Sequence, residues 1–106
     1  MRLMLVQRFV ADKRVDEGQA RQILQGFLDE LAETLDQLGK LIQNSDFTSL
    51  VQRSAALRSQ AAELCVSEVA DAAAALEMAA EAGSAVACAV HYDALRRNTA
   101  DVSQDD

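Results

Sequence analysis

Apolar residues recur at intervals of three and four through most of the chain, which is the period of an amphipathic helix. The longest such pattern begins after Asp16, a suitable N-cap residue, and continues to about Asn44. Its repeating positions are Ala20, Ile23, Leu24, Phe27, Leu28, Leu31, Leu35, Leu38 and Ile42. A helix of this length extends ~40 Å, so its apolar stripe requires partner helices along most of its length.

The following segments supply those partners. Ser45 and Asp46 can cap a second helix that continues to Leu64. Its repeating apolar and small positions are Phe47, Leu50, Ser54, Leu57, Ala61 and Leu64. A third helix is expected to be capped by Ser67 and to close at Gly83, a favourable helix C-terminal residue. Its inward positions are expected to be Val69, Ala73, Leu76 and Ala80. Because the connections are short, consecutive helices must run antiparallel.

The pattern also predicts helices at both ends of the chain. A last helix is expected from about Ser84, followed by a frayed acidic tail over residues 101–106. Its inward positions are expected to be Val86, Val90 and Leu95. In the N-terminal segment 1–14, a short helix is expected over residues 2–11. The apolar face of that short helix is expected to hold Leu3, Val6 and Val10. No composition shift divides residues 1–106, so the prediction is one all-α domain, an antiparallel four-helix bundle with a short extra N-terminal helix.

The composition favours the same class of fold. Half of the residues are apolar, Pro is absent, and only three Phe and one Tyr supply aromatic side chains. A chain of this length can bury a core without disulfides or metal, and Leu31, Leu57 and Leu76 are predicted to share that core. Cys65 and Cys88 have no metal-binding or redox spacing, so both are expected to be reduced, mostly buried thiols. No metal or cofactor is expected.

The charge of the chain limits its partners. A net charge of −7 argues against binding nucleic acid through its phosphates. Residues 1–14 are basic, which favours a solvated helix face and leaves a docking or membrane-surface element as the alternative. The longest uncharged stretch, residues 82–92, is much shorter than the ~20 residues that span a bilayer. The apolar run at the start of the chain is too short for a signal peptide, so a cytoplasmic location is predicted.

The segment DFTSLVQRSAALRSQAAELC resembles the central helix of the bacterial histidine phosphotransfer (Hpt) domains. In that family an acidic and aromatic start is followed by Leu and then by A-H-x-L-K-G-S-A-x-x-L-G. The next segment, VSEVADAAAALEMAAEAG, is similar to the following helix of the family. The matching residues are Asp46, Phe47, Leu50, Leu57, Arg58, Ala61, Leu64, Leu76, Glu77 and Gly83. The resemblance covers about residues 20–95 and implies a four-helix bundle of the histidine phosphotransfer type.

The departures from the family pattern fall where the family carries phosphate. The resemblance sets Ala55 at the phosphoacceptor position, Ser59 at a glycine, Gln60 at a common serine and Cys65 at the loop glycine. Phosphoryl transfer requires a nucleophile, which an imidazole nitrogen supplies and a methyl group does not. The resemblance therefore implies a degenerate member of the family that lacks the phosphoacceptor histidine and is not an enzyme.

What the resemblance implies for function is a binding module of two-component phosphorelay signalling. Its partner would be a response-regulator receiver domain or a histidine kinase, docked without phosphate transfer. The docking face would hold residues spaced by helical turns on the central helix: Thr48, Gln52, Ala55, Arg58, Ser59 and Ala62. Two other hypotheses remain, a structural adaptor or oligomerisation bundle and an active phosphotransferase that uses His91, the one histidine of the chain.

Overall fold

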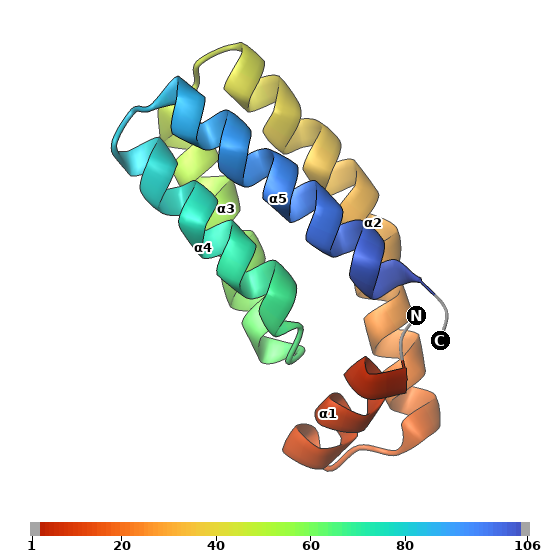
Figure 1. Ribbon diagram of the computed structural model, residues 1–106. Coiled ribbons are helices and arrows are strands. Elements are labelled where there is room, and N and C mark those ends of the chain that lie inside the picture. The colour runs from red at the N-terminus through yellow and green to blue at the C-terminus, as the bar shows by residue number, and fades with distance from the viewer. Residues whose placement is uncertain (1–2, 105–106) are drawn as a thin grey trace.

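The computed structural model describes residues 3–104, and within that range the chain forms five helices and no strand (Figure 1). The helices are α1 (Leu3–Lys13), α2 (Glu17–Gln43), α3 (Phe47–Glu63), α4 (Ser67–Glu81) and α5 (Ala85–Ser103). The prediction of an all-α fold with an N-terminal helix before the bundle is confirmed. The longest helix begins directly after its predicted N-cap, Asp16, and ends one residue before the predicted end at about Asn44.

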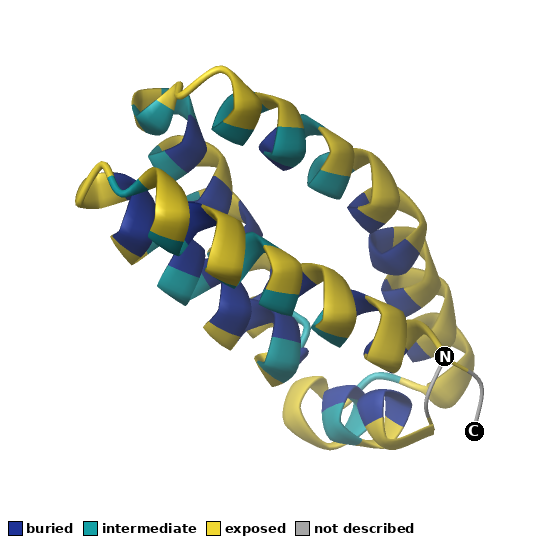
Figure 2. Ribbon diagram, turned by 45° about the horizontal axis from the view of Figure 1, so that its top comes forward, coloured by how far each residue is buried: buried dark blue, intermediate teal, exposed yellow. Residues whose placement is uncertain are grey.

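Helices α2 to α5 form an elongated bundle in which consecutive helices run antiparallel, and the molecule measures 42 × 22 × 17 Å. α4 packs most extensively against α3 and α5, while α2 closes the bundle against α3 and α5 (Figures 1 and 2). The buried face of α4 is rich in alanine, which lets neighbouring helices approach closely. These alanines are Ala70, Ala72, Ala73, Ala79 and Ala80. Helix α1 lies across the end of the bundle where α2 begins.

The three connections within the bundle, residues 44–46, 64–66 and 82–84, share one backbone geometry. Their middle residues are left-handed, with φ of 53° at Ser45, 61° at Cys65 and 66° at Gly83. The following residue donates its N–H to a carbonyl five residues back, as in the bond from Val66 to Ala61 at 2.9 Å. The prediction that Gly83 closes its helix is confirmed. Ser45 and Cys65 adopt the same conformation with a side chain, which is unfavourable compared with glycine.

The last residue of each connection also occupies the N-cap position of the next helix. The side chains of Asp46 and Ser84 accept backbone N–H groups at 3.2 Å in both cases, and Asp16 does the same for α2 at 2.8 Å. The expected cap at Ser67 is wrong. The cap position is Val66, which makes no side-chain cap bond, because the turn that ends α3 already places Val66 at the start of α4. Ser67 is therefore the first helical residue.

Most of the predicted inward positions are buried in one core, and the shared burial of Leu31, Leu57 and Leu76 is confirmed. Four expected inward residues are instead exposed: Leu3, Ile23, Val86 and Val90. In α5 the buried residues are Cys88, Leu95, Thr99 and Val102. Positions two residues from Cys88 on a helix point to nearly the opposite side, so Val86 and Val90 share a face that turns outward. In α1 the buried face is Leu5, Val6 and Phe9, which leaves Leu3 at the surface.

The predicted frayed tail is wrong for residues 101–103. They belong to α5, Val102 is fully buried, and the hydroxyl of Ser103 donates to the carbonyl of Thr99 at 2.8 Å. One buried apolar residue is enough to keep the helix on the bundle through its last turn. Residues 105–106 of the predicted tail, and residues 1–2 of the predicted N-terminal segment, lie outside the described residues.

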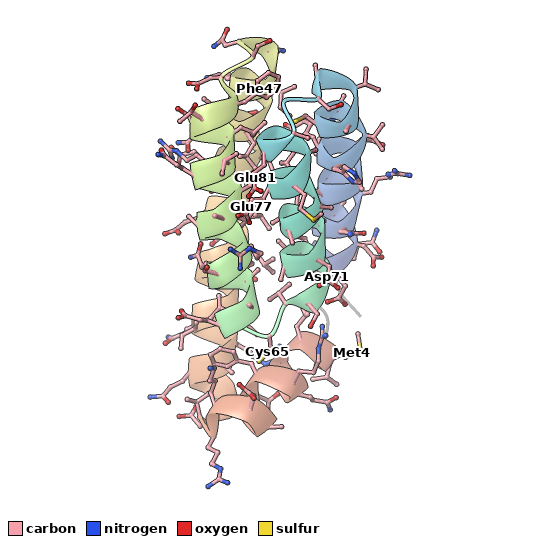
Figure 3. All side chains as sticks on the ribbon, turned by 90° about the vertical axis from the view of Figure 1, so that its left-hand side faces the viewer. Met4, Phe47, Cys65, Asp71, Glu77 and Glu81 are labelled. Carbon is pink, nitrogen blue, oxygen red and sulfur yellow. The ribbon has the colours of Figure 1, made fainter. Side chains whose placement is uncertain are left out.

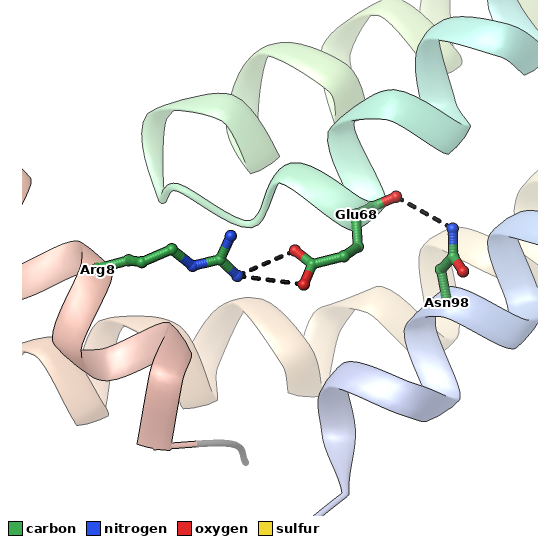
Figure 4. A network of polar contacts seen from close by, with 3 residues as sticks. All are labelled: Arg8, Glu68 and Asn98. Atoms are coloured by element: carbon green, nitrogen blue, oxygen red, sulfur yellow. Dashed lines mark hydrogen bonds and ion pairs between the residues drawn. The ribbon is translucent and has the colours of Figure 1, made fainter.

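A polar network ties α1 to the bundle (Figure 4). One guanidinium nitrogen of Arg8 donates to both carboxylate oxygens of Glu68 on α4, at 3.0 and 3.3 Å. The main-chain carbonyl of Glu68 accepts from the side-chain amide of Asn98 on α5 at 3.2 Å. Three helices therefore meet at Glu68, next to the apolar contact of α1 with the bundle.

Candidate functional site

The six residues expected on the docking face lie together on the outer side of α3. Thr48, Gln52, Ser59 and Ala62 are exposed, whereas Ala55 and Arg58 are half-buried. The opposite side of α3 is buried through Leu50, Ser54, Leu57 and Ala61. The apolar stripe of α3 thus fixes the rotation of the helix, and that rotation presents the six residues to solvent.

Ala55 follows directly after a buried residue, Ser54. The Ser54 hydroxyl makes no hydrogen bond in the structure and is inaccessible to solvent, so it is not placed to act as a nucleophile at this surface. Ala55 itself offers only a methyl group. The accessible centre of this face therefore carries no nucleophilic side chain at position 55.

Arg58, one turn after Ala55, is held by an acidic residue of the neighbouring helix. Its Nε donates to Oε1 of Glu77 on α4 at 2.8 Å, which makes an ion pair between α3 and α4. The Arg58 side chain is 43% exposed and that of Glu77 is 17% exposed. Figure 3 shows Glu77 on the side of α4 that faces α3. The sequence marked Glu77 as a family match, but it gave no signal that Glu77 and Arg58 are partners.

On its other side, α3 is joined to α2. Nη1 of Arg53 donates to the side-chain oxygen of Gln37 at 2.7 Å. Two shallow grooves run between these helices, of about 380 Å³ beside Ile23 and Gln60 and of about 400 Å³ beside Lys40 and Gln52. Helix α2 therefore borders the outer side of α3, and the surface between the two helices is hollowed at both grooves.

A larger groove, of about 800 Å³, lies between α2 and α5, away from Ala55. Tyr92 of α5 forms part of its lining, and its hydroxyl donates to the main-chain carbonyl of Leu35 at 2.8 Å. Gly39 faces the same ring, so that a Cβ atom at position 39 would lie 2.8 Å from the tyrosine oxygen. The groove thus borders a close approach of α2 and α5 at Gly39.

His91 lies on α5 and is half-buried. Helix α4 lies between α3, which carries Ala55, and α5, which carries His91 (Figure 3).

The two thiols are free, with Cys88 buried and Cys65 half-buried. Burial raises the pKa of the Cys65 thiol, and a hydrogen bond to Asp12 raises the pKa further. Burial alone raises the pKa of Cys88. Both sulfurs therefore stay protonated and weakly nucleophilic at neutral pH. Across residues 3–104, no helix combines the length and the apolar character that crossing a membrane requires.

Comparison with known proteins gives a family for the chain. A family profile described as Hpt domain matches residues 22–105, which begin within the first turns of α2 and include α3, α4 and α5. Helix α1 precedes the matched region. Neither the curated proteins nor the solved structures gave a match.

Proposed function

The chain belongs to the Hpt domain family of phosphorelay signalling, and from this membership we propose that it binds a response-regulator receiver or a histidine kinase without accepting phosphate. Hpt domains act with receivers and kinases. The observation that carries the proposal is Ala55, a methyl group on the accessible side of α3 at the position that the family pattern gives to the phosphoacceptor. Without a nucleophile there, docking has no covalent outcome.

The backbone supports the alignment that sets Ala55 at this position. In that alignment Cys65 replaces a glycine of the family, and Cys65 has the left-handed φ of 61° that favours glycine. Gly83, which the same alignment matches to a family glycine, has the corresponding φ of 66°. A shift of the central-helix match by one residue would lose the correspondence at Cys65.

The surface around Ala55 suits a protein partner. Four of its six residues on α3 have short side chains, and grooves along α2 border it, so a partner helix can approach closely. Arg58 supplies a positive charge where the family pattern has lysine. An acidic receiver pocket would be attracted to that charge. Because receivers and kinases of such pathways work in the cytoplasm, that location stays part of the proposal.

The proposal is tested by mixing the protein with a panel of phosphorylated receivers and measuring binding and phosphate transfer in parallel. Binding to at least one receiver or kinase is expected, with no acid-labile phosphate on this chain. Transfer at a rate comparable to that of an active Hpt domain would contradict the proposal. In that event the variant His91→Gln would show whether the one histidine of the chain is the acceptor.

A gain-of-function variant tests the position of Ala55 directly. The double change Ala55→His with Ser59→Gly places an imidazole on the docking face and clears space beside it, so it should acquire acid-labile phosphate, even if slowly. The matched control is Ala56→His with Ser59→Gly, because Ala56 is the exposed next residue of α3. If both variants fold and bind receivers but neither takes phosphate, Ala55 is not the acceptor position.

A second candidate function, a structural adaptor that associates with itself, is favoured by one observation. Met78, Val86 and Val90 are 70%, 78% and 58% exposed on α4 and α5. Sedimentation velocity tests this candidate. A concentration-dependent dimer that binds neither receivers nor kinases would support the adaptor and exclude the docking proposal.

A further inference from the structure

The positive charge of Arg58 on the proposed docking face is paired with a negative charge on the neighbouring helix. Arg58 donates through Nε to Glu77, and no other hydrogen-bond partner of Arg58 occurs among residues 3–104. The bond joins two helices, since Arg58 lies on α3 and Glu77 on α4. Glu77 therefore acts on the docking face from outside the helix that forms it.

The geometry leaves part of the guanidinium available. Glu77 occupies the Nε side, whereas the two terminal nitrogens can still donate to a second anion. The exposures agree, because the Glu77 side chain is mostly buried and that of Arg58 is 43% exposed. A carboxylate or phosphoryl group of a partner can thus reach Arg58 while Glu77 stays in place.

The negative charge of Glu77 weakens the attraction between Arg58 and an approaching anion. A guanidinium paired with a carboxylate at 2.8 Å acts at longer range as a dipole, whose field falls off faster than that of a single charge. The partner anion also meets the negative charge of Glu77. An acidic partner is therefore attracted less strongly than a lone arginine would attract it.

We propose that Glu77 is a positioning residue that orients Arg58 and partly neutralises it, so that Glu77 limits the affinity of this face for an acidic receiver. The proposal rests on the proposed function, and it adds a residue that lies outside α3. Gln at position 77 would keep the acceptor oxygen for Nε and remove the charge. Ala would remove both.

The test measures receiver binding by the variants Glu77→Gln and Glu77→Ala. Glu77→Gln should raise the affinity about 3- to 10-fold, chiefly through a faster association rate that falls with added salt. Glu77→Ala should gain less, because the guanidinium loses its orientation. The control is Asp71→Asn, which makes the same change of charge on α4 at an exposed residue on the side away from α3 (Figure 3). The control should leave the affinity nearly unchanged.

A double-mutant cycle separates action through Arg58 from a general charge effect. In an Arg58→Gln background, Glu77→Gln should no longer raise the affinity. The proposal is overturned if Glu77→Gln gains no more than Asp71→Asn, or if its gain persists without Arg58. Receiver binding by the wild type would leave the proposed function standing in both cases.

A readout without a receiver covers the case in which the wild type binds none and the proposed function fails. Inorganic phosphate is titrated into the labelled protein, and the Nε–H signal of Arg58 is followed by NMR. A larger shift in Glu77→Gln than in the wild type and Asp71→Asn would support restraint of Arg58 by Glu77. Equal shifts in all three proteins would overturn it.

Discussion

Ser54 and Ala55 are neighbours on α3, yet the Ser54 side chain is fully buried and that of Ala55 reaches the surface. The buried hydroxyl of Ser54 makes no hydrogen bond, which is an unfavourable state for a polar group. The family pattern has alanine at this position. Ser54 is buried because it lies in the apolar stripe of α3. The destabilisation that its unpaired hydroxyl causes can be measured.

Ser54→Ala should stabilise the protein by about 1–3 kcal/mol, because it removes an unsatisfied buried hydroxyl and improves helix propensity. Urea denaturation would measure the free energy of unfolding. The control is Ser59→Ala, an exposed serine of the same helix, where only the propensity gain of about 0.5 kcal/mol is expected. Equal gains from the two substitutions would show that the Ser54 hydroxyl finds a partner in solution.

At the scale of the helices, α2 and α5 approach closely at one glycine, Gly39. Tyr92 reaches the carbonyl of Leu35 by passing over Gly39, where a Cβ atom would be only 2.8 Å from its oxygen. A Cβ atom at Gly26, on the same helix, would meet no neighbouring element within 4 Å. A side chain at position 39 would therefore have to displace the Tyr92 ring, whereas one at position 26 would displace no neighbouring element.

Gly39→Ala should be more favourable by about 1–2 kcal/mol in a Tyr92→Phe background than in the wild type, since Phe lacks the oxygen that the new methyl would meet. Thermal or urea denaturation of the four proteins gives this coupling energy. Gly26→Ala is the control and should stabilise both backgrounds by about 1 kcal/mol. An additive result at Gly39 would mean that the tyrosine moves aside at no cost.

The helices were predictable from sequence because each buries one stripe of regular period, as in α2, where caps and apolar positions agree. The inward face of α5, by contrast, could not be predicted from the sequence. Val86 and Val90 form one apolar stripe, and Cys88, Leu95 and Val102 form another, so the choice between them depends on contacts with α2 and α4. The ion pair of Arg58 and Glu77 could not be predicted either, because it forms only once α3 and α4 are packed together.

At the scale of the whole molecule, α1 is an addition to the region that matches the family, but it is part of the core. Leu5, Val6 and Phe9 are buried in the same cluster as the bundle residues. The ion pair of Arg8 with Glu68 fixes α1 against α4. The end of the bundle at which α2 begins is therefore closed by α1.

Phe9→Ala should destabilise the whole protein by about 3–5 kcal/mol, the usual cost of truncating a buried phenylalanine. The denaturation midpoint of the entire domain should fall, as judged by circular dichroism. Leu3→Ala, at an exposed residue of the same helix, should change the free energy of unfolding by less than about 0.5 kcal/mol. If Phe9→Ala left the midpoint unchanged, α1 would be a separate, weakly attached element.

The three connections of the bundle leave no spare residue, since the residue that completes the turn of one helix also begins the next. An inserted residue would separate the hydrogen bond that closes the turn from the residue that begins the next helix. Point substitutions at these connections are tolerated, as serine and cysteine in left-handed positions show. During evolution, descendants of this sequence should therefore exchange glycine and small residues at positions 45 and 65, while changes of length within these connections should be rare.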